Sequence, residues 1–298
     1  MKIYDCFMFF DEEMLLDLRL NIMDKYVDKF VITEATYMHS GKSKKLIFDI
    51  NKFAKFKDKI IYIVVDKPPP DLLKIEDSDS LHEKYTKMIH NAKKREIFQI
   101  NKAGDGIIKA EPNDIIIISD LDEIPNLEKI NFEIINKKLF FFKQKMFYYK
   151  FNLFYKSFPW YGSKACKKKF LKNPEWLRSI KNRIYPIWRL DIFFSKIKYN
   201  NIYFVDEGGW HFSNIRKPED LEKKLSNFLH YIDFQESGLN LNDLKKLMDE
   251  KKIMYDHSVD QRGSKWGDGQ KLQSLQLHEM PEHIVENYQK YKDWLDIG

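Results

Sequence analysis

Short apolar runs alternate with longer amphipathic stretches through the first 126 residues. The runs show little polar alternation, which is typical of strands that are buried on both faces. They predict strands at residues 3–10, 30–36, 60–65 and 115–119. Apolar residues at helical spacing predict helices at 11–26 and 81–101, the second of them after the breaker formed by residues 68–70. This order of elements favours an α/β fold with a mainly parallel central sheet flanked by helices.

The pattern changes after residue 126. Residues 139–155, LFFFKQKMFYYKFNLFY, are aromatic and partly alternating, which favours antiparallel strands or a hairpin beside the parallel sheet. Residues 202–213 predict one more strand with a glycine pair, and 218–233 predict an amphipathic helix. The remainder is expected to be helical, apart from a charged, glycine-rich loop at 256–270. Since no internal repeat or long linker is present, we expect a single domain over residues 1–298.

Charge and cysteine usage narrow the setting in which the chain works. The 51 Lys and Arg against 45 Asp and Glu give a net charge of +6, which favours anionic partners, although a generally lysine-rich composition would give the same excess. Cys6 and Cys166 form no CxxC spacing, so neither a zinc site nor a disulfide framework is predicted, as suits a reducing compartment. No apolar stretch has the length of a secretory core or a membrane span. We therefore expect a cytoplasmic protein without a transmembrane segment that can make peripheral contact with a membrane surface.

The segment DIIIISDLDEIPN, residues 114–126, runs an apolar strand directly into three carboxylates. Ligands of an open parallel sheet bind at the carboxyl ends of its strands, where Asp120, Asp122 and Glu123 are expected. Asp120 and Asp122 share one face of an extended segment and can bind one divalent cation, Mn²⁺ or Mg²⁺, together with substrate phosphates. The plainer alternative is that Asp120 caps a turn and that the other two acids are solvated.

Four blocks of the chain resemble glycosyltransferase family 17, the group of the β-1,4-mannosyl-glycoprotein 4-β-N-acetylglucosaminyltransferases. They are YDCFMFFDEEMLLDLRL (4–20), VITEATYMHSGKSKKLIF (31–48), IIIISDLDEIPN (115–126) and GGWHFSNIRKPEDLEKKLSNFLH (208–230). The resemblance implies a GT-A-like, Rossmann-type nucleotide-sugar fold, with residues 1–126 as the nucleotide-sugar half and 127–298 as the acceptor half. It also implies a UDP-sugar donor, with UDP-GlcNAc expected, and transfer with inversion to a glycan or glycolipid acceptor. The animal members carry an N-terminal membrane anchor, which we do not expect in this chain, so their acceptor is not carried over.

The same resemblance suggests roles for individual residues. Asp120 and Asp122 match the motif for the metal and the diphosphate. In the second-strand block, Glu34 is expected at the base or ribose, beside Gly41 and Lys42. Further matches are Arg95 as a diphosphate partner and Trp210, His211 and Ser213 as lining of the sugar or acceptor pocket. The family usually has an acid shortly before the arginine of this helix, whereas this chain reads HNAKKREIF.

Inverting transfer needs a base that takes the proton of the acceptor hydroxyl. The stretch DEGGWH places Glu207 and Asp206 next to a glycine pair and His211. Glu207 is our first candidate, followed by Asp206, with Glu123, His211 and Asp260 behind them. A solvated turn for the two acids, and a hydrogen-bonded core histidine for His211, would explain the same residues without catalysis.

Two other functions remain compatible with the residues alone. A metal-dependent nucleotidyltransferase or phosphohydrolase could also use acids at a strand end, but no GxGxxG or GxxxxGK[ST] phosphate loop is present. A non-enzymatic binder of nucleic acid or a membrane surface would need only the basic charge; with the resemblance in view, no nucleic-acid partner is expected. Flat faces for sugar rings could come from Trp160, Tyr161, Trp188 and Trp210, while most other aromatic residues are expected in the core.

Overall fold

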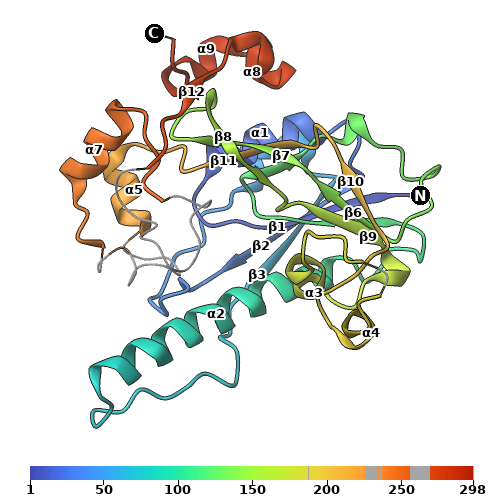
Figure 1. The fold of residues 1–298 in the computed structure, drawn as a ribbon, viewed down its shortest axis with the longest axis horizontal. Coiled ribbons are helices and arrows are strands. Elements are labelled where there is room, and N and C mark those ends of the chain that lie inside the picture. The colour runs from blue at the N-terminus through green and yellow to red at the C-terminus, as the bar shows by residue number, and fades with distance from the viewer. Residues whose placement is uncertain (187, 226–233, 235–236, 256–268, 298) are drawn as a thin grey trace.

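The computed structural model describes residues 1–298 except 187, 226–233, 235–236, 256–268 and 298. A seven-stranded sheet lies at the centre of the fold, in the order β10-β6-β9-β4-β1-β2-β3 (Figure 1). The strands are β1 (Ile3–Met8), β2 (Lys29–Ala35), β3 (Ile60–Val65), β4 (Ile115–Ile118), β6 (Leu139–Phe142), β9 (Lys164–Lys167) and β10 (Ile202–Val205). Within it, β3, β2, β1 and β4 are mutually parallel neighbours. The prediction of a parallel sheet in the first 126 residues is therefore confirmed.

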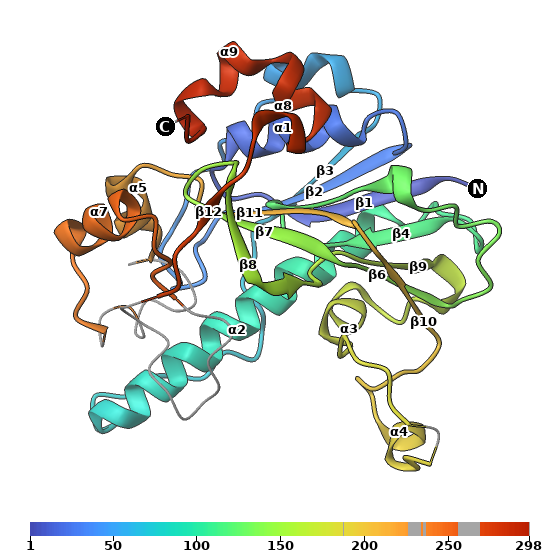
Figure 2. The same ribbon diagram turned by 45° about the horizontal axis from the view of Figure 1, so that its top comes forward.

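The isoleucine run of β4 explains why this strand lies inside the sheet. Ile115 and Ile117 pack on one face, in a core formed with α1 (Glu13–Met23), while Ile116 and Ile118 pack on the other with α2 (Leu81–Gly106). Side chains alternate across a strand, so an unbroken apolar run is what a sheet covered on both faces requires. Figure 2 shows α2 below the sheet and α1 above it.

A second, five-stranded sheet packs beside the first, in the order β12-β8-β7-β11-β5. Its strands are β5 (Glu123–Pro125), β7 (Gln144–Tyr148), β8 (Leu153–Trp160), β11 (Gly209–Ser213) and β12 (Gln273–Ser274). The predicted antiparallel pairing in the aromatic region is present between β7 and β8. Residues 202–213 were expected to form one strand, but the chain passes from β10 in the large sheet to β11 in the small one through a turn at residues 206–208.

The remaining helices cover the outside of the two sheets. α3 (Pro174–Ser179) joins α2 on one face, and α8 (Glu282–Glu286) and α9 (Tyr288–Tyr291) lie near α1 on the other (Figure 2). α5 (Pro218–Leu225) and α7 (Leu241–Asp249) pack on the small sheet in a third core. The helix expected over 218–233 is described as far as Leu225. α4 (Asp191–Phe194) belongs to a loop that projects beyond α3 in both views.

Candidate active site

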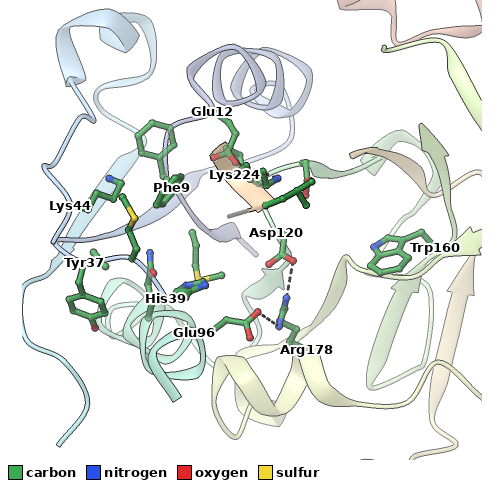
Figure 3. Close-up of a pocket in the computed structure, with 18 residues that line it drawn as sticks. Phe9, Glu12, Tyr37, His39, Lys44, Glu96, Asp120, Trp160, Arg178 and Lys224 are labelled. Atoms are coloured by element: carbon green, nitrogen blue, oxygen red, sulfur yellow. Dashed lines mark hydrogen bonds and ion pairs between the residues drawn. The ribbon is translucent and has the colours of Figure 1, made fainter. Parts of the chain in front are cut away.

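A cavity of about 380 Å³ opens at the carboxyl ends of β1, β2 and β4. Parallel α/β sheets bind ligands at this edge because loops and helix starts converge there. In Figure 3, Tyr37 and Lys44 lie on one side of the cavity and Trp160 on the other, with Asp120 between them. The cavity thus has an aromatic side chain at each end and an acidic centre. Its lining includes Phe9, Phe10, Glu12, Tyr37, His39, Lys44, Glu96, Gln99, Asp120, Asp122, Trp160, Arg178 and Lys224.

The backbone of the acidic loop, residues 119–123, is fixed by hydrogen bonds from Arg19 of α1. This arginine is fully buried, and its guanidinium binds both carboxylate oxygens of Asp5 at 2.8 and 2.6 Å. It also donates to the Ser119 hydroxyl at 2.6 Å and to three backbone carbonyls, those of Asp120, Leu121 and Glu123, at 2.9, 3.1 and 2.8 Å. The planar, fixed geometry of a guanidinium suits this bridging role. The ion pair therefore fixes the loop that presents the acids to the cavity.

Asp122 lies against His211, with 3.6 Å between Asp122 Oδ2 and His211 Nε2. Burial alone would raise the pKa of Asp122, but the neighbouring imidazole outweighs it and lowers the pKa to about 2. Burial opposes protonation of His211, yet the charge of Asp122 raises the pKa of the imidazole above its ordinary value. Asp122 is therefore ionised where it lines the cavity, and His211 is a positioning partner for it.

Asp120 forms an ion pair that reaches across the cavity floor to α3. Its Oδ2 lies 2.8 Å from Nη2 of Arg178, and Nη1 of the same guanidinium lies 3.2 Å from Oε1 of Glu96 in α2. The charge of Asp120 raises the pKa of Arg178 further above its ordinary range. One arginine thus faces the acidic centre, where it is placed to meet an anionic group of a ligand.

Lys164 of β9 fixes the end of the helix that carries Arg178. Its ammonium donates to the backbone carbonyls of Arg178 and Ile180, each at 2.6 Å, and so satisfies acceptors at the end of α3. Burial lowers the pKa of Lys164 from 10.5 to about 8. Burial of the charged Lys164 side chain therefore costs desolvation free energy, and its hydrogen bonds fix the position of Arg178.

Glu123 points away from the open part of the cavity. Its Oε1 accepts from the Trp160 indole at 2.6 Å, and its Oε2 accepts from the backbone N–H of Asp120 at 2.7 Å. A Cβ at Gly162 would lie 1.9 Å from Glu123 Oε1, so only glycine leaves room for this carboxylate. Burial and the charge of Asp120 raise its pKa. We interpret Glu123 as a support for the loop and for Trp160, which differs from the role of base expected for it.

The acids expected as bases are not brought to the cavity. Glu207 has a side chain 75 % exposed and lies 3.4 Å from Lys129, and Asp206 is 82 % exposed and lies 3.4 Å from Lys143. Neither lines the cavity. Their role as bases stays a prediction, and the structure gives the reason for their position: the turn that carries them lies in solvent, whereas His211, further along in β11, pairs with Glu123. Asp260 lies outside the described residues.

Residues 31–48, the second-strand block, support the end of the cavity that is lined by Tyr37. Glu34 is fully buried and accepts from Tyr62 and from the backbone N–H groups of Ile47 and Phe48 at 2.8–3.1 Å, and it pairs with Lys44, so its oxygens are engaged within the protein.

Gly41 has φ +93°, and Arg95 Nη2 would lie 2.8 Å from a Cβ there. Arg95 also donates to the His39 carbonyl at 3.0 Å, while Lys42 is exposed. Glu34, Gly41, Lys42 and Arg95 are thus outside the cavity lining, and Arg95 supports the loop that provides Tyr37 and His39.

Of the three residues expected from β11, His211 lies at the site, beside Asp122. Trp210 packs in the core between the sheets, on the face opposite His211, and the Ser213 hydroxyl hydrogen-bonds the side chain of Tyr148. Of the four aromatic residues considered as sugar platforms, Trp160 lines the cavity and stacks near His211 with ring centroids 4.8 Å apart. Tyr161 packs against Phe204, and Trp188 is 80 % exposed on the α4 loop.

The two aspartates of the loop suit a hard cation. Asp120 Oδ1 is buried and has no hydrogen-bond partner in the described structure, while Oδ2 binds Arg178. No group of three or more His, Cys, Asp or Glu side chains in the described part of the chain is arranged to hold a metal. Asp120 and Asp122 therefore fit Mg²⁺ or Mn²⁺ that takes its other ligands from substrate phosphates and water, and they do not form an all-protein cage.

Arg178 and Glu96 were not anticipated from the sequence. The stretch NPEWLRS carried a usable signal, since Asn173 caps α3 and Pro174 occupies its first turn. That signal predicts a short helix but not which sheet edge it approaches. The link to Asp120 spans 58 residues and is visible only in the folded chain.

A polar and aromatic cavity at the carboxyl edge of a parallel sheet is the usual ligand site of an α/β enzyme. A sequence profile described as glycosyltransferase family 17 matches residues 1–296. The chain belongs to glycosyltransferase family 17. It is accordingly a glycosyltransferase that uses a sugar donor and an acceptor, and the nucleotidyltransferase, phosphohydrolase and non-enzymatic interpretations are set aside.

Two further findings concern relatives and membrane spans. No curated protein sequence matches the chain. Across the described residues, no helix combines the length and the apolar character that a bilayer span requires.

Proposed function

We propose that this glycosyltransferase transfers a sugar from a nucleotide diphosphate donor, with UDP-GlcNAc as the expected donor, and that it depends on Mn²⁺ or Mg²⁺. The observation that carries the proposal is the acidic loop: Asp120 and Asp122 line one cavity, and one buried oxygen of Asp120 has no hydrogen-bond partner in the described structure. A GT-A-like fold is part of the proposal. It is supported by the parallel order β3-β2-β1-β4 and by the position of the acids at the end of β4.

The two ends of the cavity suit the two ends of such a donor. Tyr37 offers an apolar face for the base, and Trp160 offers a flat face for the sugar on the opposite side of Asp120 (Figure 3). Phe10 adds a second ring at the Tyr37 end, where its centroid lies 5.3 Å from the Lys44 ammonium. The diphosphate would then lie at the acidic centre. There it would meet the Arg178 guanidinium and the cation held by Asp120 and Asp122.

Arg178 and a cation held by the two aspartates would stabilise the diphosphate as the leaving group. When the bond from the anomeric carbon to the diphosphate breaks, negative charge develops on the departing oxygen. Arg178 is placed to bind that charge because its guanidinium lines the cavity beside Asp120. A bound Mg²⁺ or Mn²⁺ supplies Lewis-acid stabilisation of the same oxygens. Inversion at the anomeric carbon, which the family resemblance implies, remains part of the proposal.

Calorimetry with UDP tests the sugar-donor site without knowledge of the acceptor. We expect the wild type to bind UDP about tenfold or more tightly with Mn²⁺ than without it, since Asp120 and Asp122 would hold the cation and the cation would attract the phosphates. Asp122→Asn should lose this dependence, while Glu207→Gln, which changes an exposed acid, should keep it. Equal binding of UDP with and without Mn²⁺, or an unchanged metal dependence in Asp122→Asn, would refute the metal-dependent site.

A further inference from the structure

The loop between α3 and β10 carries a dense set of exposed apolar side chains. We call residues 181–198 the basic aromatic loop; all of them except 187 are described. Phe194 is 90 %, Trp188 80 % and Phe193 79 % exposed, and Leu190 and Ile184 are exposed as well. Among the described residues, these three are the aromatic side chains that lie more than half in solvent. Strongly exposed apolar residues elsewhere, such as Leu81, Ile108 and Ile134, are far apart in the sequence, as is ordinary for a protein surface.

The loop is held in place at its base, so the exposure of its tip is a property of the fold. Asn200 hydrogen-bonds the backbone of Tyr185 twice, at 2.8 and 2.9 Å, and the N–H of Lys181 donates to the carbonyl of Ile197 at 2.9 Å. The Tyr185 side chain is buried, and so is Ile180 directly before the loop. The stem is therefore anchored to the protein body, while the aromatic tip is presented outward. In both ribbon views α4 lies at the end of this projection (Figures 1 and 2).

The charge of the loop is strongly positive. It contains one acid, Asp191, and five basic residues, Lys181, Arg183, Arg189, Lys196 and Lys198, so its net charge is +4. Asp191 lies 2.6 Å from both Arg189 and Lys198 and is neutralised by them. Lys181, Arg183 and Lys196 are exposed and flank the aromatic tip in the sequence.

We propose that the basic aromatic loop docks the protein on the surface of an anionic lipid bilayer. Aromatic and aliphatic side chains are favoured at the boundary between head groups and acyl chains, and Lys or Arg beside them add attraction to anionic lipids. The combination of an apolar tip with net positive flanks matches this surface better than it matches a neutral protein face. The loop begins two residues after α3, whose Arg178 lines the cavity, so docking holds the cavity close to the lipid surface.

Vesicle flotation tests the docking. We expect the wild type to bind phosphatidylcholine vesicles with about 30 % phosphatidylglycerol at least tenfold more strongly than pure phosphatidylcholine vesicles. The triple variant Trp188→Ser, Phe193→Ser, Phe194→Ser should lose most of this binding. Lys181→Gln, Arg183→Gln and Lys196→Gln should each weaken it about fivefold. The matched control, Leu81→Ser with Ile108→Ser and Ile134→Ser, removes equally exposed apolar side chains elsewhere and should bind as the wild type does.

Other outcomes separate this proposal from the alternatives. Absence of binding to the anionic vesicles, or equal losses in the control and the loop variant, would overturn it. If the triple variant instead converts a dimer to a monomer in light scattering and leaves vesicle binding unchanged, the loop is a self-association surface and the proposal fails. UDP binding by the loop variants, measured in solution, should equal that of the wild type. Failure of the docking and failure of the sugar-donor site are therefore distinguishable.

Discussion

Two pairs of acids follow strands of the large sheet, Asp120 and Asp122 after β4, and Asp206 and Glu207 after β10. In the sequence both pairs stand beside apolar runs and look equally suited to chemistry. In the folded chain the first pair lines the cavity on a loop whose carbonyls are fixed by Arg19. The second pair is solvated, and each of its acids lies 3.4 Å from a surface lysine.

The difference shows what makes a carboxylate useful at a strand end. Water around Asp206 and Glu207 screens their charges and leaves their side chains free to move. The Asp122 carboxylate is mostly buried beside His211, which lowers its pKa to about 2, so Asp122 remains ionised over the physiological range. We expect the first pair to contribute more to binding, because the contacts around it set the positions of its carboxylates before a ligand arrives.

The largest effect is expected from neutralising the acids of the loop. Asp120→Asn and Asp122→Asn each remove a charge from the acidic centre, and we expect kcat/KM for transfer from the sugar donor to fall on the order of 10²- to 10³-fold. The measurement is the rate of nucleotide release from the sugar donor in the presence of acceptor. A loss below about threefold in both variants would contradict the assignment of the catalytic centre to this loop.

Removing Arg19 should break the support beneath the loop. Arg19→Met leaves the buried Asp5 carboxylate without its partner, and we expect a loss of about 3–5 kcal/mol in the free energy of unfolding by urea. The double variant Asp5→Leu, Arg19→Met should recover part of this stability because no unpaired charge remains. It should not recover UDP binding, since the carbonyls of the loop still lack their donor. Recovery of both, or wild-type behaviour of the single variant, would show that the ion pair does not shape the site.

The buried Lys164 predicts a pH dependence of stability. Its folded pKa of about 8 lies below the ordinary 10.5, so the unfolded chain holds this proton more tightly between these values. The cost of the buried charge is complete below about pH 8 and is relieved as the pH rises toward 10.5, which amounts to up to about 3 kcal/mol.

Lys164→Met removes this contribution. The stability of the wild type relative to the variant should therefore increase between pH 8 and pH 10. Urea unfolding of both proteins at three pH values measures the difference, and a constant difference would rule out the lowered pKa.

The smallest effect is expected at the exposed turn. Glu207→Gln and Asp206→Asn should each change transfer activity by less than about twofold, because both side chains lie in solvent outside the cavity. The assay is the one used for the loop variants, so the two pairs are compared directly. Loss of transfer with intact UDP binding in Glu207→Gln would restore this residue as the base and reverse the comparison.

Local patterns predicted much of the fold. Strands β1 to β4 were predicted because each is a short, largely apolar run, and α2 because helical spacing follows the breaker at residues 68–70. The split of residues 202–213 between two sheets could not be predicted. The spacing of apolar residues indicates which side chains are buried, but it does not indicate which sheet a strand joins. The turn at 206–208, with Glu207 at φ +47°, directs β11 into the small sheet.

The sequence could predict only those site residues that are neighbours along the chain. Asp120 and Asp122 were identified because they directly follow the isoleucine run. The partners of these acids come from far along the chain: Arg178 of α3 is 58 residues from Asp120, and His211 faces Asp122 from another strand. Arg19 was part of the first recognised block, but nothing in its surroundings indicates that it binds carbonyls about a hundred residues later.

The position of Arg19 has a consequence for how the site forms during folding. Its pairing with Asp5 bridges 14 residues, whereas its bonds to the loop bridge 100 to 104 residues. Contacts of such long separation carry a large loop-closure entropy and form late. We therefore expect the acidic loop to take its shape only after β4 has paired with β1, so that a partly folded chain carries all the acids but no assembled site.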